Sequence, residues 1–302
     1  MKKSGALVNL ANLFFLLAVI LAFFKTDYEL KSPIAYLAVL VILEAFFIKN
    51  VLSQEDNSSI KDTFAIVFAI ILLWDVEAKY LKLFHHTILP PPENVFAVFV
   101  QDYDQMILGM FHSVAMIVIG VGAGTVAGVF AGLFVGWFVR IRRSLKPIVN
   151  VVAAIPALVY APYVVAIAPT FQAASFSIIF LGVFWPTLML MMNSVTNIDK
   201  KILDSAYALN LSTPTIIFKV LLPYSVMPIM SGLKIQIAMA VMILTMAETI
   251  GSSVGLGYYV KKWSDFAVYD KVFAGIILMA VVITGLNKLI DLYESKALKW
   301  IR

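Results

Sequence analysis

Long apolar segments dominate this sequence of 302 residues and set the first limit on its fold. A transmembrane helix needs about 20 consecutive, mostly apolar residues. Eight runs fit that requirement and lie at roughly 6–24, 33–52, 63–83, 108–139, 148–170, 174–196, 225–250 and 272–291. Hydrophobic residues make up 62% of the chain and charged residues only 14%, whereas a soluble domain carries about a quarter charged residues. We therefore expect an all-α integral membrane protein with about eight transmembrane helices.

The basic residues between these runs indicate how the chain crosses the membrane. If the amino terminus is cytoplasmic, 15 of the 23 Lys and Arg residues fall in cytoplasmic segments and 7 outside, with Lys234 inside a run. Cytoplasmic loops generally carry the excess of Lys and Arg. The first run lacks a small-residue cleavage site, so we do not interpret it as a cleaved signal peptide. We expect a multi-pass protein of the plasma (inner) membrane with both termini cytoplasmic, and the net charge of +5 reflects this topology rather than nucleic-acid binding.

Composition also excludes several kinds of chemistry. The chain has no cysteine, which excludes a disulfide framework, a thiol nucleophile and a cysteine-ligated metal. Its three histidines, His85, His86 and His112, are too few and too close to the ends of runs to indicate a metal site. The chain lacks the phosphate-binding motif Gly-x-x-x-x-Gly-Lys-Ser/Thr, so we do not expect it to bind ATP in the usual manner. We predict no catalytic residue, no metal and no cofactor bound by this chain.

A change in pattern near residue 88 suggests two parts. Residues 1–87 hold about three of the runs, joined by ordinary polar loops. The prolines of the segment Leu89-Pro90-Pro91-Pro92-Glu93 cannot continue a helix, so they mark an external break before a short amphipathic stretch at 94–103. We predict accessory transmembrane helices in 1–87 and a working core of about five transmembrane helices in 88–302.

Five glycines recur at every fourth position along the run 108–139. They are Gly120, Gly124, Gly128, Gly132 and Gly136. A row of this kind lets another backbone approach closely, and such small-residue rows drive helix packing in lipid. We predict a helix-packing surface. The alternative is a surface that slides or rocks during transport.

Prolines interrupt the run 148–170, which makes it a poor lipid-facing helix. A carbonyl that loses its hydrogen bond at membrane depth is tolerated only inside protein or beside water. We therefore predict that this run, together with the run 225–250, lines a polar pathway, although structural kinking alone remains an alternative. The candidate pathway residues are Pro156, Tyr160, Pro162, Tyr163 and Glu248.

Few ionisable residues lie inside the apolar runs. Glu44 and Glu248 do, and a carboxylate at membrane depth is a functional candidate because its burial is costly. For Glu248 the alternative is a structural hydrogen bond to the turn at 251–257. Asp75 and Lys79 are spaced i,i+4 and are expected to form an interfacial ion pair.

The segment between the sixth and seventh runs predicts two short helices. Asp199 is suited to cap the first helix, and Asn210 to the left-handed position that ends it. Ser212 or Thr213 can cap the second helix, which Pro223 closes.

Small residues give the first of these helices a narrow face. Ser205, Ala206 and Ala208 form this face, with Leu209 and Leu211 as apolar anchors. A short helix held outside the membrane suits docking into a groove of a cytoplasmic partner. An ordinary helical hairpin at the membrane interface explains these residues equally well.

The same segment resembles the EAA loop of ABC importer permeases. The family order is Glu-Ala-Ala, three residues, Gly, nine residues, Ile, one residue, Leu-Pro. Here Asp204-Ser205-Ala206, then Asn210, then Leu222-Pro223 follow that order without a gap. Asp and Ser are mild departures, and Asn is the next best residue after Gly for a left-handed turn.

Three further stretches resemble one group of these permeases, those for taurine, alkanesulfonates, nitrate, bicarbonate and thiamine precursors. They are Leu-Pro-Pro-Pro at 89–92, the proline-rich segment 147–162, and Ala-Glu-Thr-Ile-Gly-Ser-Ser-Val-Gly-Leu-Gly-Tyr at 247–258. The resemblance covers about 88–302. The group usually has one span before this core, so the extra pair of spans in 1–87 is a departure.

The resemblance implies the membrane subunit of a type I ABC importer for a small anionic or polar organic solute. Such a chain pairs with a second permease chain, taken here as an identical copy. A cytoplasmic ABC ATPase dimer holds ATP and Mg, and an extracytoplasmic solute-binding protein delivers solute around 84–107 and 251–271. The residues assigned to ATPase coupling are Asp204, Ser205, Ala206, Leu209, Asn210, Leu211 and Pro223.

Two other classes of protein fit parts of the sequence. A secondary transporter driven by protons or sodium would use Glu248 as its ion site. A non-transporting scaffold would recruit a soluble partner through 199–223. The two-helix loop favours the ABC importer, because a secondary transporter has no need of a docking site for a nucleotidase.

Overall fold

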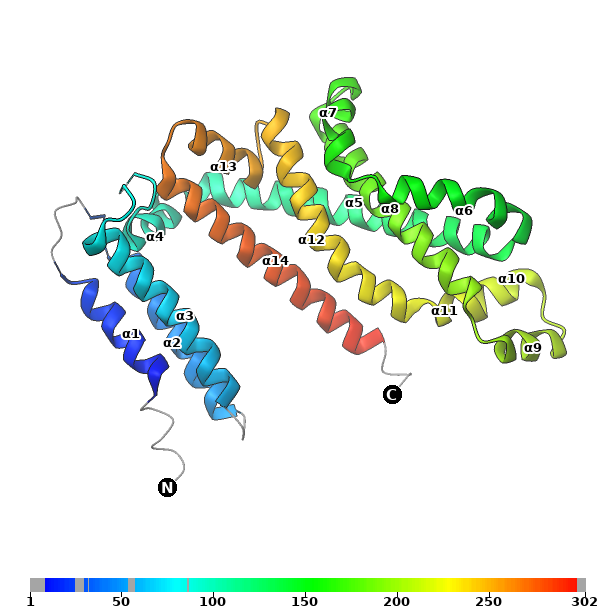
Figure 1. The fold of residues 1–302 in the computed structure, drawn as a ribbon, viewed down its shortest axis with the longest axis horizontal. Coiled ribbons are helices and arrows are strands. Elements are labelled where there is room, and N and C mark those ends of the chain that lie inside the picture. The colour runs from blue at the N-terminus through cyan, green and yellow to red at the C-terminus, as the bar shows by residue number, and fades with distance from the viewer. Residues whose placement is uncertain (1–8, 25–29, 32, 54–57, 86, 298–302) are drawn as a thin grey trace. The chain divides into compact units, whose positions relative to one another are not determined.

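The computed structural model describes residues 9–24, 30–31, 33–53, 58–85 and 87–297, and every regular element in those ranges is a helix (Figure 1). Five helices are long and apolar enough to cross a membrane: α2 (Ile34–Ser53), α5 (Tyr103–Trp137), α8 (Phe171–Thr196), α12 (Val226–Gly251) and α14 (Tyr269–Ala297). The expected all-α membrane fold is confirmed.

The number of spans depends on the bent helix pair α6 (Val139–Ala154) and α7 (Ala157–Ile167). Counted as one broken span, this pair raises the total to six. The apolar helix α1 (Leu10–Leu21) is shorter, and α3 (Ser58–Val76) contains three charged residues, Lys61, Asp62 and Asp75. The count of eight therefore stays a prediction.

The run expected as a single span at 148–170 is two helices that meet at 88° (Figure 1). Proline has no backbone N–H and disfavours a helical conformation in the residue before it. Accordingly, Ile155 has an extended backbone with a ψ of 117°, and Pro156 is the N-cap residue of α7. The predicted run also missed the beginning of α6, which starts only two residues after α5 ends.

By their packing the residues form two compact units. Unit 1 contains 1–107 and 259–277, and unit 2 contains 108–258 and 278–302. In unit 1, α1, α2 and α3 pack against one another, and α2 packs against α4 (Pro92–Gln101). Thus α4 lies beyond the predicted boundary at 87/88 yet shares a core with the accessory helices. The buried residues at the centre of this core are Tyr36, Leu40, Phe47, Phe68 and Phe96.

Unit 1 buries Glu44 of α2 and, separately, a cluster of three charged side chains. Lys79, in the short π-helix η2 (Glu77–Leu81), pairs with Asp75 at 2.7 Å and with Glu93 of α4. All three side chains are 0% exposed. The expected pair of Asp75 and Lys79 is therefore present, but it lies inside the protein and has a second carboxylate that the sequence did not indicate.

Unit 2 is organised around α8. This helix packs against α6, α7 and α12, and the row of five glycines on α5 also faces it. A Cβ placed on any of the five would come within 3.0 Å of α8 atoms, including the carbonyl oxygens of Phe180, Phe184 and Leu188. The absence of side chains on this row is therefore what allows α5 and α8 to approach so closely.

Candidate functional site

The break between α6 and α7 borders a cavity of about 190 Å³ in unit 2. Pro156 and Tyr160 of this pair line it, together with Gly182 and Trp185 of α8 and Ile243 of α12. A Cβ on Gly182 would lie 2.9 Å from the Ile243 side chain and 3.7 Å from the Tyr160 hydroxyl, so a larger residue there would fill the space.

The other predicted pathway residues do not line this cavity. Pro162 is exposed and the Tyr163 side chain is 73% exposed on α7. Glu248 is 1% exposed and lies near the end of α12, away from the lining residues of the cavity. The structure thus brings together Pro156 and Tyr160 of the five candidates.

Glu248 is bound by hydrogen bonds on both carboxylate oxygens. Ser113 of α5 donates its hydroxyl to Oε1 at 2.7 Å, and the backbone N–H of Gly257 donates to Oε2 at 2.7 Å. The Ser113 oxygen in turn accepts the N–H of Leu256 at 2.9 Å. This carboxylate joins α5, the end of α12 and the first residues of α13 (Leu256–Asp265).

Gly255 makes this arrangement possible. Its φ is +127°, a conformation that residues with a side chain rarely adopt. A Cβ there would also lie 2.2 Å from Oε1 of Glu248. The close approach of the Glu248 carboxylate therefore explains why residue 255 is a glycine.

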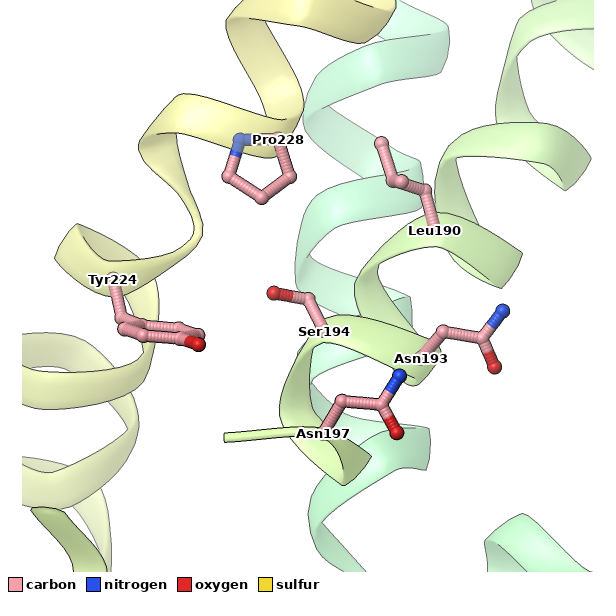
Figure 2. Close-up of a pocket in the computed structure, with 6 residues that line it drawn as sticks. All are labelled: Leu190, Asn193, Ser194, Asn197, Tyr224 and Pro228. Atoms are coloured by element: carbon pink, nitrogen blue, oxygen red, sulfur yellow. The ribbon is translucent and has the colours of Figure 1, made fainter. Parts of the chain in front are cut away.

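A second pocket of about 430 Å³, with several polar side chains in its lining, lies between the end of α8 and the beginning of α12 (Figure 2). Its lining is Leu190, Asn193, Ser194, Asn197, Tyr224 and Pro228. Ser194 points from α8 toward the segment with Tyr224 and Pro228 (Figure 2), and its hydroxyl lies 3.0 Å from that of Ser225. The lining is uncharged and offers amide and hydroxyl groups that can donate hydrogen bonds to oxygen atoms of a solute.

Sequence reasoning missed this pocket, although a signal was present. Asn193, Ser194 and Asn197 stand at the end of an apolar run, and the two Asn residues are four positions apart and so share a helix face. Tyr224 and Pro228 are distant in sequence, and only the fold brings them to the same pocket.

Three buried polar side chains join α12, α8 and α5 in unit 2. Gln236 of α12 donates to the Thr187 hydroxyl of α8 at 2.8 Å and accepts the Thr125 hydroxyl of α5 at 3.3 Å. All three residues are buried. Because each group has a partner, this contact stabilises the helix arrangement rather than leaving a free binding group.

The segment between α8 and α12 begins with α9 (Lys200–Ala208). The Asp199 carboxylate accepts the N–H of Lys201 at 2.9 Å at its beginning. At its end Asn210 has a φ of 53°, and the N–H of Leu211 reaches back to the Ala206 carbonyl at 3.1 Å. A second helical stretch follows. It consists of α10 (Thr213–Ile216), the short π-helix η3 (Ile217–Leu221) and α11 (Leu222–Tyr224), so the helical backbone continues through Pro223.

The residues of α9 divide into a buried and an exposed side. Ala206 is 4% exposed and packs in a cluster with Leu133 of α5 and Met191 of α8. Asp204, Ser205 and Asn210 are exposed, as is Leu209 at 72%, while Leu211 and Pro223 are half-buried. The small residue at 206 is therefore needed for packing beneath α9, and the exposed side of this segment includes Asp204, Ser205, Tyr207, Ala208 and Leu209.

In unit 1, Tyr259 of α13 is held by a charged pair. Its hydroxyl donates to the Asp102 carboxylate at 2.9 Å, and Lys271 pairs with the same carboxylate at 2.7 Å. Burial, and then the hydrogen bond to Asp102, raise the pKa of Tyr259 well above its ordinary value. The phenol therefore stays protonated and acts as a donor at every physiological pH.

In the described part of the chain, acidic and histidine side chains nowhere gather in a group of three that could hold a metal ion. His86 lies outside the described residues. His112 lies 3.7 Å from the Glu248 carboxylate through Nδ1.

Residues 124–299 match the model of the protein family described as "Binding-protein-dependent transport system inner membrane component". The provisionally named aliphatic sulfonates transport permease protein SsuC of Bacillus subtilis is 28% identical over 237 residues, which cover 76% of this chain and 84% of that protein. The taurine transport system permease protein TauC of Escherichia coli is 28% identical over 47% of this chain and 52% of its own length. The nitrate import permease protein NrtB of Leptolyngbya laminosa is 30% identical over 51% and 55%.

The fold also matches a solved structure. A chain of the MetNI methionine ABC transporter in an inward-facing conformation superposes with a TM-score of 0.52 over 63% of this chain and 97% of that chain. The sequence identity of 19% limits this likeness to the fold.

Proposed function

This chain belongs to the family of binding-protein-dependent transport system inner membrane components, and we propose that it forms the translocation pathway of an ATP-driven importer. Its relatives are transport permeases rather than enzymes. Permeases of this kind work with an ATPase and a solute-binding protein. We further propose that the imported solute is a small anionic or polar organic compound, of the sulfonate, taurine, nitrate or thiamine-precursor type.

The observation that carries the proposal is the structure of α9. Leu209 is 72% exposed beside the exposed Ser205 and Ala208, while Ala206 beneath them is buried against α5 and α8. An exposed apolar residue on a short rigid helix is suited to a groove on a partner, and the packing under Ala206 connects that helix to the spans. A cytoplasmic ABC ATPase dimer, which would hold ATP and Mg, is the proposed partner.

In this proposal Asp204, Ser205 and Leu209 contact the ATPase. Ala206 and Leu211 hold α9 against the spans, Asn210 ends α9 with its left-handed turn, and Pro223 lies in the helical stretch that leads into α12. Movement of the ATPase subunits is thereby passed to α8, against which Ala206 packs.

The proposed pathway passes the cavity beside Pro156 and Tyr160 and leaves through the pocket of Asn193, Ser194, Asn197 and Tyr224. Neutral amides and hydroxyls bind an oxygen-rich solute weakly enough for it to leave, whereas a fixed cation would retain an anion. Solute would arrive from a binding protein at the outer segments 84–107 and 251–271. Two identical permease chains, each with both termini in the cytoplasm, complete the proposed assembly.

Co-purification tests the central claim. The full-length chain is expressed with its chromosomal neighbours and purified in mild detergent, and a phosphate-loop ATPase is expected to elute with it. Vesicles made from the same complex should take up solute only when the ATPase side is supplied with ATP. Absence of any ATPase together with uptake driven by an ion gradient would replace the proposal with secondary transport.

A further inference from the structure

An aromatic pocket of about 350 Å³ lies at the end of α5, where α10 and η3 approach it. Its lining residues are Phe130, Leu133, Phe134, Phe138, Thr213, Pro214, Ile217 and Phe218. The four phenylalanine side chains are between 39% and 52% exposed. Two ring pairs form the walls, Phe134 with Phe138 at 4.7 Å and Phe130 with Phe218 at 6.4 Å between centroids. The only polar side chain in the lining is that of Thr213.

Exposed cations follow lining residues of this aromatic pocket closely in sequence, after Phe138 and after Phe218. Arg140 and Arg143 lie in the first turns of α6, directly after Phe138, and are three positions apart on one helix face. Lys219 follows Phe218 on the other wall and is exposed. None of these three has an acidic partner in the part of the chain that the structure describes.

The orientation of α6 keeps these cations outside the protein core. Ile141, Leu145 and Val149 recur at every fourth position and pack in a cluster with Leu188 and Met192 of α8. Arg140 and Arg143 therefore stand on the opposite side of α6, where both are exposed. An apolar pocket beside unpaired cations is complementary to a molecule with an apolar chain and an anionic head.

We propose that the aromatic pocket binds one acyl chain of an anionic phospholipid, whose phosphate pairs with Arg140 and Arg143. Arginine suits this role because its planar guanidinium binds phosphate oxygens in a bidentate manner. Lys219 adds a further positive charge on the opposite wall. This inference rests on the proposed function at one point. It requires that this end of α5 lies at the cytoplasmic boundary of the membrane, where anionic lipid headgroups are available.

Native mass spectrometry of the full-length permease tests the inference. The protein in mild detergent is titrated with phosphatidylglycerol or with phosphatidylcholine of identical acyl chains. We expect phosphatidylglycerol to be retained more strongly. Arg140→Gln with Arg143→Gln should lower its retention by about tenfold, to the level of phosphatidylcholine, since each basic residue near an anionic membrane contributes substantially to binding.

Two further variants distinguish binding of the lipid headgroup from binding of the acyl chain and from a general effect of positive charge. Phe218→Ala removes one wall and should lower the retention of both lipids. Lys200→Gln with Lys201→Gln removes the same charge from α9 and should leave retention unchanged. Equal retention of both lipids by the wild type, an unaffected arginine variant, or an equal loss in the α9 variant would each overturn the proposal. Because lipid retention is read directly, none of these outcomes depends on whether an ATPase co-purifies.

Discussion

Lys79 and Glu93 form an ion pair in which both side chains are 0% exposed. The pair connects η2, at the end of the accessory helix α3, to the first turn of α4, and Asp75 joins it from α3 at 2.7 Å. A buried charge is tolerated only when it is paired. The accessory helices and α4 are therefore joined through Lys79, whose loss would leave two buried carboxylates without a cation.

Lys79→Met is expected to destabilise unit 1 strongly. It leaves the carboxylates of Asp75 and Glu93 buried without a cation, and breaking a buried pair by removing one partner typically costs about 3–5 kcal/mol. Adding Glu93→Gln should recover part of that loss, because one unpaired charge is then removed. Thermal unfolding in detergent measures both. Lys49→Met, at an exposed position of α2, serves as the control and should change the Tm little. A Tm for Lys79→Met equal to that of the control would show that the buried pair contributes nothing.

The row of glycines on α5 provides a test with an internal control. A Cβ at Gly132 would lie 2.7 Å from the Leu188 carbonyl oxygen and 2.5 Å from the Met191 Cβ, whereas a Cβ at Gly122 meets nothing within 4 Å. Gly132→Ala should therefore force α5 away from α8 and lower stability by about 1–3 kcal/mol. Gly122→Ala should be neutral or slightly stabilising. Equal unfolding temperatures for the two variants would mean that α5 and α8 do not pack as described.

The docking surface proposed on α9 is tested by Leu209→Arg. Leu209 is 72% exposed, so the variant should fold normally. An arginine on the apolar contact should reduce ATPase co-purification by at least about tenfold, as expected for a residue that dominates an interface. Ser144→Arg adds the same charge at an exposed position of α6 and serves as the control. Full ATPase association with Leu209→Arg would remove α9 from the docking surface.

The variant Ala206→Arg would not test docking of the ATPase on α9 in the same way. Its side chain is 4% exposed beneath α9, so an arginine there would disturb packing against α5 and α8 before it affected any partner. From the sequence, Ala206 and Ala208 share one small-residue face. Which of two small residues on a nine-residue helix faces inward depends on what packs against it, and the local sequence does not contain that information.

Features that depend on local chemistry were predictable, and those that depend on distant partners were not. Asp199 caps α9, and Asn210 has the expected positive φ, because both follow from the residue type and its neighbours. The partner of Lys79 on α4 and the residues that line a pocket together with Asn193 of α8 are brought in by the fold. The break at Pro156 is intermediate, since proline predicts an interruption but not the angle.

The left-handed turn at Asn210 predicts an order among substitutions. Asn210→Gly should be tolerated, because glycine adopts the observed φ of 53° without strain. Asn210→Val places a β-branched side chain in that region and should cost about 1–2 kcal/mol at the turn, with a corresponding loss of coupling between ATP hydrolysis and uptake. The ratio of solute imported to ATP hydrolysed in reconstituted vesicles measures this. Equal ratios for the Gly and Val variants would show that the turn does not set the position of α9.

Glu248→Gln distinguishes an importer from an ion-coupled transporter. Glutamine retains one acceptor oxygen, so it can bond either the Ser113 hydroxyl or the Gly257 N–H but not both, as the carboxylate does at 2.7 Å each. We expect a loss of stability of about 1–3 kcal/mol, typical of an unsatisfied buried donor. Uptake per folded protein should remain substantial, dependent on ATP and insensitive to ionophores, because the carboxylate holds α13 in place and carries no ion. The assay is uptake into vesicles with and without ATP, for wild type and variant, with gradients collapsed by ionophore. Uptake by the wild type that follows an ion gradient without ATP, and that is abolished in Glu248→Gln although the variant is folded, would instead assign the carboxylate to ion transport.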